Sequence, residues 1–120
     1  MEKKIKFKRS LEALIADSEI VIDRKKGSAH PRYPDYIYPL DYGYIKGTKS
    51  QDGGGIDVWV GSGDQKIVSG MLVIFDPVKK DSEIKVLVGC SDEESETALK
   101  CSNRGDMVAF EIKFNKGEII

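Results

Sequence analysis

The sequence has little of several features that mark particular classes of protein. It holds two cysteines and one histidine, and no apolar run approaches the roughly 20 residues that span a bilayer. Cys90 and Cys101 have neither the spacing of a metal site nor the density of a disulfide scaffold, so we expect free thiols and a cytoplasmic protein. Residues 1–6 are charged but no apolar segment follows them, which argues against a signal peptide and a membrane partner.

The net charge of the chain is small as well. The 120 residues carry a formal charge of −1, so the chain as a whole does not attract nucleic acid. A content of 40% hydrophobic and 32% charged residues is typical of a soluble globular protein. The length fits one domain, which we expect to span residues 1–120. Self-association into a homo-oligomer is left open.

Short elements with tight turns between them indicate the fold class. Ser10 as a cap and apolar residues at helical spacing predict a helix at 10–17. Strands are expected at 19–23, 56–60, 66–75, 83–90 and 107–114, and a second helix at 91–102. Gly70 predicts a bulge in its strand. Since no βαβ spacing is present, the pattern predicts a mainly β, α+β fold, a small antiparallel barrel or curled sheet with helices outside.

One stretch, residues 33–60, concentrates the side chains that suggest chemistry. All five tyrosines lie in its first half. Downstream, Asp52 and Asp57 flank a glycine triplet whose backbone can adopt positive φ and approach a ligand closely. One carboxylate on a turn and one on the following strand suit a hard cation with oxygen ligands. A plain hairpin connector beside a half-buried tyrosine face is the alternative reading.

A second acidic pair follows the strand at 66–75. Asp76 and Asp81 bracket its turn and, taken alone, are typical turn formers. Together with Asp52 and Asp57 they predict a multi-metal site, and we expect the two acidic loops to converge on one cleft.

Basic residues lie upstream of the tyrosines. Arg32 can clamp phosphate oxygens through two parallel hydrogen bonds. The basic turn at 24–28 fits either an electropositive rim or an ordinary solvated turn. His30 has no neighbour that marks it as a base or a ligand, which favours a structural role.

Two motifs in order resemble a known family. Tyr38-Pro39-Leu40-Asp41-Tyr42-Gly43-Tyr44-Ile45 and Asp52-Gly53-Gly54-Gly55-Ile56-Asp57-Val58 resemble the signature of the family I soluble inorganic pyrophosphatases. That signature reads Tyr-Pro-x-x-Tyr-Gly-Tyr-Ile, then Asp-Gly-Asp-Pro-hydrophobic-Asp-hydrophobic. The resemblance covers residues 20–88, in a chain shorter than typical members. Gly54 and Gly55 depart from it, because they stand where the signature has Asp and Pro.

The resemblance implies a five-stranded OB-like barrel with flanking helices and hydrolysis of inorganic pyrophosphate to two phosphates. Mg²⁺ is the implied cofactor, with Mn²⁺ as second candidate. The implied metal ligands are Asp52, Asp57, Asp76 and Asp81. The implied catalytic residues are Asp57 and Tyr42. The implied phosphate-binding residues are Arg32, Tyr42, Lys85 and Lys100, where Lys85 matches only across a two-residue insertion.

The departures from the signature bear on activity. In the family, the aspartate replaced here by Gly54 helps to position and deprotonate the attacking water, so we expect a reduced rate. The lysine and glutamate of the family's first strand would fall near Glu19 and Val21. Two alternatives therefore stay open: a hydrolase of another phosphoanhydride, or a non-catalytic module that binds a phosphorylated ligand.

Overall fold

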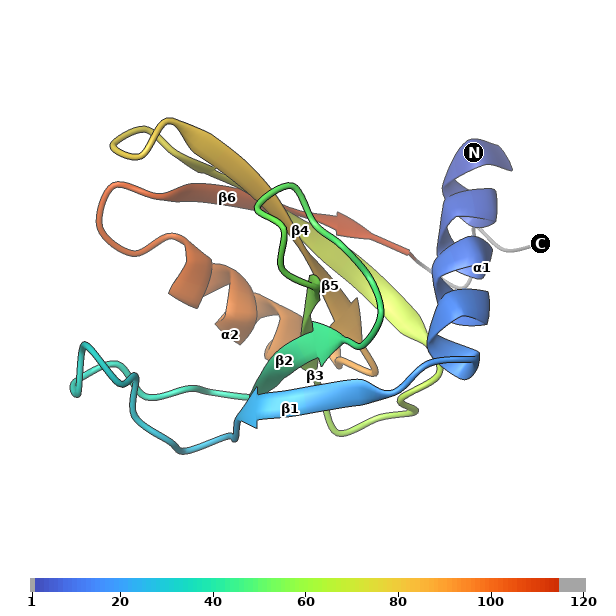
Figure 1. Cartoon of the computed structure of the whole chain (residues 1–120), viewed down its shortest axis with the longest axis horizontal. Coiled ribbons are helices and arrows are strands. Elements are labelled where there is room, and N and C mark those ends of the chain that lie inside the picture. Colours follow the sequence, from blue (N-terminus) through green and yellow to red (C-terminus); the bar gives the residue numbers. More distant parts are fainter. Residues whose placement is uncertain (1, 115–120) are drawn as a thin grey trace.

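A computed structural model describes residues 2–114. Its elements are α1 (Glu2–Ala16), β1 (Ile20–Arg24), β2 (Asp41–Ile45), β3 (Ile56–Val60), β4 (Val68–Asp76), β5 (Asp81–Val88), α2 (Asp92–Ser102) and β6 (Val108–Lys113). The strands form one sheet in the order β1-β2-β3-β5-β4-β6, with the two helices outside it (Figure 1). The predicted mainly β, α+β class is confirmed. The sheet has six strands instead of the expected five, and it resembles a barrel only loosely because its two edges do not pair.

The strand that the sequence did not reveal is β2. Asp41 and Gly43 are residue types depleted in strands, and they hide it. Gly43 lies opposite Ile22 of β1, and a Cβ added there would lie 1.8 Å from the carbonyl oxygen of Val21. Glycine is therefore required for the close approach of β1 to β2.

The pairing of β3 with β5 is parallel, whereas every other pair in the sheet is antiparallel. The short connections predicted a purely antiparallel sheet, and this prediction is wrong for the β3–β5 pair. The reason is that β4, the next strand in the chain, lies on the far side of β5. The hairpin then returns the chain to place β5 beside β3.

Helix α1 begins at Glu2, well before the predicted start at Ser10. The Ser10 hydroxyl does not cap it but donates to the carbonyl oxygen of Lys6, one turn earlier, at 2.8 Å. Lysine and glutamate are good helix formers, which extends the helix toward the N-terminus. Lys8 is buried, and its ammonium lies 2.5 Å from Glu12 Oε2, which also accepts the backbone N–H of Val68 at 2.9 Å. This contact ties α1 to the start of β4.

Side chains of the sheet alternate between two faces, and each face has its own core. The core under α1 consists of Ile15, Ile45, Val58, Val60, Val68, Met71, Val86, Val88 and Phe114. The core on the opposite face, which includes α2, consists of Tyr38, Leu40, Trp59, Leu72, Ile74, Leu87 and Ala98. Asp57 shares this second face, which we call the α2 face, because it lies two residues before Trp59 on β3.

The other predicted elements agree with the structure to within about two residues at each end. The bulge expected at Gly70 is confirmed by a shift of register between Val68 and Gly70. Helix α2 starts with a capping box, in which the Ser91 hydroxyl accepts the backbone N–H of Glu94 and the Glu94 carboxylate accepts that of Ser91.

Candidate active site

Three predicted site residues meet on the α2 face, on three neighbouring strands. Lys85 on β5 lies opposite Asp57 on β3 in the parallel register, and Tyr42 on β2 lies opposite Trp59. The Lys85 ammonium donates a hydrogen bond to the Tyr42 hydroxyl. It also lies 3.7 Å from Asp57 Oδ2. The structure thus brings together the motif tyrosine, the motif aspartate and the lysine that matched only across an insertion.

A fourth residue of this group, Glu83, was missed from the sequence. Its Oε1 lies 3.5 Å from the Lys85 ammonium. Glu83 precedes Lys85 by two positions on β5, so the two side chains share one face of the sheet. That alternation is a signal in the sequence that could have identified Glu83.

The surroundings of Tyr42 determine its protonation state. Burial raises the pKa of the Tyr42 hydroxyl well above its usual range, and the negative charges of Asp57 and Glu83 raise it further. The ring packs against Trp59, with ring centroids 4.6 Å apart. Tyr42 is therefore a neutral hydroxyl at any physiological pH, held in place by an aromatic neighbour.

Asp52 lies in the loop between β2 and β3, exposed to solvent. Its Oδ1 accepts hydrogen bonds from the Ser50 hydroxyl at 2.5 Å and from the backbone N–H of Gly54 at 2.9 Å. The bond from Ser50 is the largest cause of a lowered Asp52 pKa, and the charge of Lys85 contributes as a weaker one. Asp52 therefore lies within electrostatic reach of Lys85 and stays ionised.

The glycine triplet has a defined geometry in that loop. Gly53 has a φ of 89°, whereas Gly54 is not among the residues with positive φ. A Cβ added at Gly54 would have one close neighbour, Asp52 Oδ1 at 3.3 Å. The left-handed position is thus Gly53, and the backbone at Gly54 accepts a side chain once the exposed Asp52 carboxylate shifts by a few tenths of an ångström.

Asp76 and Asp81 face each other at the far end of the β4–β5 hairpin. Asp76 Oδ1 accepts the backbone N–H groups of Val78 and Lys79 at 3.0 and 3.1 Å, the contacts of a turn former. Asp81 lies four residues before Lys85 on the same strand, which is about 13 Å at the usual rise of a strand. These two carboxylates share the α2 face with Asp57 but lie apart from it.

The four aspartates therefore do not form a preformed metal-binding cluster, and their convergence on one cleft stays a prediction. Within residues 2–114, no group of three or more His, Cys, Asp or Glu side chains is close enough to hold a metal ion. The physical reason is the length of the hairpin, which carries Asp76 and Asp81 beyond the row of the sheet that holds Asp57.

Arg32 and His30 lie in the long loop between β1 and β2. His30 Nδ1 accepts the backbone N–H groups of Arg32 and Tyr33 at 3.0 and 3.2 Å, and its ring packs near Tyr36 and Tyr38. These are contacts of a structural histidine. The side chain of Arg32 is exposed, so the loop presents a guanidinium to solvent.

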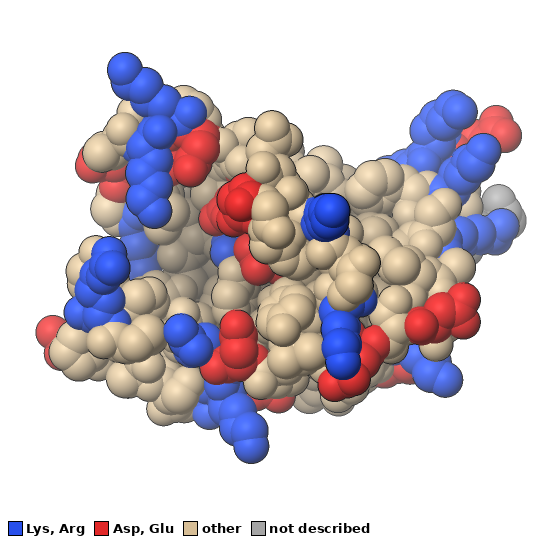
Figure 2. Space-filling view, viewed as in Figure 1, with Lys and Arg blue, Asp and Glu red and all other residues tan. Residues whose placement is uncertain are grey.

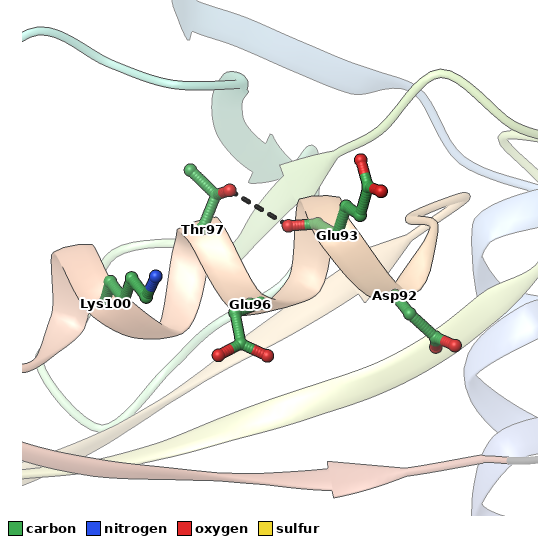
Figure 3. A pocket seen from close by; sticks show the side chains of 5 residues that line it. All are labelled: Asp92, Glu93, Glu96, Thr97 and Lys100. Carbon is green, nitrogen blue, oxygen red and sulfur yellow. Dashed lines mark hydrogen bonds between the residues drawn. The ribbon is translucent and has the colours of Figure 1, made fainter.

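Lys100 lies elsewhere, on helix α2. It lines an open depression of about 390 Å³ together with Asp92, Glu93, Glu96 and Thr97. Figure 3 shows these side chains along the helix, with the Thr97 hydroxyl donating to the carbonyl oxygen of Glu93 at 2.9 Å. Three carboxylates and one ammonium line it, so this depression by itself repels a polyanion.

Charged side chains border a hollow on the face shown in Figure 2. By comparison with Figure 1, the hollow lies between the β4–β5 hairpin and the β1–β2 loop, with Lys and Arg side chains along its rim and acidic side chains at the centre of the view. A hollow bordered by both basic and acidic side chains suits an anion that binds together with cations.

A comparison with protein-family models matches residues 15–110 to Inorganic Pyrophosphatase. This match covers most of the chain and includes both motifs, Asp57, Glu83 and Lys85. The chain therefore belongs to the inorganic pyrophosphatase family, and hydrolysis of inorganic pyrophosphate is the activity that this membership assigns to it.

Solved structures agree in fold. An inorganic pyrophosphatase from Helicobacter pylori has a TM-score of 0.55 at 17% identity, over 87% of this chain and 88% of that chain. An inorganic phosphatase from Anaplasma phagocytophilum gives 0.53 at 16% identity, over 78% and 81%. An inorganic pyrophosphatase from Coxiella burnetii gives 0.51 at 14% identity, over 83% and 86%. At such identities the likeness shows the fold alone.

No curated protein matches the chain. Neither α1 nor α2, the helices of residues 2–114, is long and apolar enough to cross a membrane.

Proposed function

We propose that this chain hydrolyses pyrophosphate on the α2 face, at the site formed by Tyr42, Asp57 and Lys85, with Mg²⁺ as cofactor and Mn²⁺ as substitute. The observation that carries the proposal is the contact among these three residues. They come from separate strands, and two of them lie at the motif positions of the family.

The donor set fits a hard divalent cation. Asp57 and Glu83 each offer a carboxylate oxygen within 3.7 Å of the Lys85 ammonium, and Asp52 on the β2–β3 loop lies within electrostatic reach of the same ammonium. Mg²⁺ in phosphoryl-transfer sites is commonly held by one or two carboxylates plus substrate oxygens, so a full protein cage is not required. When bound, such an ion lowers the pKa of a coordinated water and neutralises the charge on the phosphates.

The protein groups around that ion then bind and orient the substrate. The Lys85 ammonium supplies a positive charge and the Tyr42 hydroxyl a hydrogen-bond donor, because Tyr42 stays protonated. The hydrogen bond between them holds both side chains on one face of the sheet, where they can orient a phosphate. Asp57 serves as the inner metal ligand.

The remaining predicted residues bind further metal ions or the outer phosphate, away from Tyr42, Asp57 and Lys85. Asp52, Asp76 and Asp81 are ligands for further metal ions that accompany pyrophosphate, which carries several negative charges. Arg32 reaches the outer phosphate from the exposed loop. Lys100 has the least support as a phosphate ligand, because the depression that it lines is mainly acidic.

Gly54 lowers the rate in this proposal. The residue has no side chain to accept a proton from the attacking water, and general-base assistance is typically worth about 10²- to 10⁴-fold. We therefore propose a slow enzyme.

We also propose that the chain forms a single domain, resides in the cytoplasm and associates with a second copy of itself. Support for self-association comes from large apolar side chains exposed on the α1 side of β4 and β6. Phe75, Val108 and Phe110 are 51%, 60% and 58% exposed. The partner would be a second copy of this chain, which sedimentation at several concentrations would detect.

The experiment that tests the function is phosphate release from a panel of phosphoanhydrides with Mg²⁺. We expect pyrophosphate to be hydrolysed faster than nucleoside di- and triphosphates. Preference for another member of the panel would make this chain a hydrolase of that phosphoanhydride. Stoichiometric binding of pyrophosphate without any turnover would show a binding module instead.

A further inference from the structure

The position of Lys85 suggests more than a phosphate ligand. Its ammonium contacts three groups at once: Asp57 Oδ2 at 3.7 Å, Glu83 Oε1 at 3.5 Å and the Tyr42 hydroxyl. The side chain of Lys85 is 16% exposed, whereas those of Asp57 and Glu83 are 28% and 42% exposed. A largely buried cation thus lies between two carboxylates that water can still reach.

These two carboxylates share the Lys85 ammonium on the α2 face, and a divalent cation can be held by such a pair together with water and substrate oxygens. Without Lys85 they would carry two like charges beside a buried neutral hydroxyl, an arrangement that costs free energy unless a cation is present. Lys85 therefore supplies, beside these two carboxylates, the positive charge that a divalent cation could also supply.

The Lys85 ammonium cannot stay on the two carboxylates when a divalent cation binds to them. A divalent cation on Asp57 and Glu83 needs their oxygens and repels the ammonium that now contacts them. Phosphate oxygens, in turn, are the natural partner for an ammonium that has lost its carboxylates.

We propose that Lys85 is the resident counter-cation of the metal site, which Asp57 and Glu83 release when they bind a divalent ion, and that the freed ammonium then binds the phosphate of the substrate. This proposal rests on the proposed function for the place of the metal ion. It assigns to Glu83 the role of second metal carboxylate, and it makes metal binding and anion binding mutually favourable.

The test measures Mn²⁺ binding to the whole protein without substrate, from the electron paramagnetic resonance signal of free Mn²⁺. Lys85→Met removes the competing charge, so we expect it to bind Mn²⁺ about tenfold tighter than the parent. Lys46→Met is the matched control, because Lys46 also pairs with a carboxylate, Glu19, at 3.9 Å, but on the exposed surface. We expect its affinity to stay within about twofold of the parent.

Two further variants separate competition from damage to the fold. Lys85→Arg keeps the charge, so we expect parental Mn²⁺ affinity, while a merely perturbed site would change in both Lys85 variants. Glu83→Gln in the Lys85→Met background should lose the tenfold gain, because the second carboxylate is gone.

The coupling is measured with methylene diphosphonate, a pyrophosphate analogue that is not hydrolysed. In the parent, saturating Mn²⁺ should increase its affinity, and in Lys85→Met this increase should be at least about fivefold smaller, since the ammonium is missing.

The proposal is overturned if Lys85→Met binds Mn²⁺ no tighter than Lys46→Met does, or if none of the proteins binds Mn²⁺. Failure of the parent to hydrolyse pyrophosphate is a separate result. It would remove the catalytic function while a tighter Mn²⁺ site in Lys85→Met would still show the competition.

Discussion

Lys85 and Asp57 lie directly opposite each other on two parallel strands, with Lys85 Nζ 3.7 Å from Asp57 Oδ2. The pairing exists because β4 is placed outside β5, which leaves β5 free to pair with β3. The aspartate of the glycine-rich motif thereby meets a lysine from the next hairpin. The sheet topology, and not sequence proximity, assembles the site.

Loss of the Tyr42 hydroxyl should slow the reaction without unfolding the protein. Tyr42→Phe keeps the ring contact with Trp59 but removes the acceptor of the Lys85 hydrogen bond and the donor to phosphate. We expect kcat for pyrophosphate to fall about tenfold, as for one lost charge-assisted hydrogen bond. Tyr33→Phe, at an exposed tyrosine, is the control and should match the parent. An unchanged kcat in Tyr42→Phe would remove the hydroxyl from the mechanism.

Alkaline pH should destabilise the fold through the same residue. The pKa of Tyr42 is raised in the folded state, so its stabilising contribution is complete below the ordinary tyrosine pKa of about 10 and is lost as pH rises above it. Denaturant titrations at about pH 9 and pH 11 should show a smaller loss of unfolding free energy in Tyr42→Phe than in the parent. Equal losses in the two proteins would argue against the raised pKa.

The capping carboxylate of α2 gives a prediction about stability at acid pH. Glu94 accepts the backbone N–H groups of Ser91 and Ser62, and the bond from Ser91 is the main cause of its lowered pKa. Glu94→Ala should cost about 1 kcal/mol at neutral pH. Because the folded-state pKa is lowered, the difference from the parent should disappear as pH falls through that value.

Glu93→Ala is the matched control for this measurement, since Glu93 is exposed in the same helical turn and its side chain makes no capping bond. It should lose only the smaller interaction with the helix dipole. Equal losses in the two variants would show that the charge, and not the cap, stabilises α2.

Restoring the missing carboxylate should accelerate the enzyme. Gly54→Asp places a carboxylate beside Asp52 on a backbone that tolerates a side chain, and the only close neighbour of its Cβ is a side-chain oxygen. We expect turnover of pyrophosphate to rise about tenfold or more, within the usual range for a general base. The melting temperature should change little when Mg²⁺ is present.

Gly53→Asp is the control for this substitution. It adds the same charge one residue earlier, where φ is 89°, so it should cost about 1–2 kcal/mol and give no gain in rate. A faster Gly53→Asp, or a Gly54→Asp that stays at the parental rate with an intact fold, would show that another group activates the water.

The sequence predicted those parts of the molecule that depend on local pattern. The Tyr42 and Asp57 motifs, the strands with alternating or continuous apolar residues and the capped helix α2 were all predictable, because each signal lies within about ten residues. The site residue Glu83 could have been found in the same way, from its spacing to Lys85.

What could not be predicted depends on contacts between distant segments. The local signal for β2 is weak, because Gly43, which is there for the close approach of β1, interrupts its strand-favouring tyrosines. The parallel pairing of β3 with β5 follows from the placement of β4 outside them, which no local pattern records. For the same reason, the sequence did not reveal that Asp76 and Asp81 lie apart from Asp57.

The central claim is that Asp57 lies at a metal-dependent site that hydrolyses pyrophosphate. The most direct measurement is Mg²⁺-dependent phosphate release from pyrophosphate by the parent, Asp57→Asn and Asp23→Asn, an equivalent change at an exposed residue of β1. We predict Mg²⁺-dependent release by the parent and by Asp23→Asn, and a loss of about 100-fold or more in Asp57→Asn with its fold intact. Equal rates in all three proteins, or release that does not depend on added metal, would contradict the account.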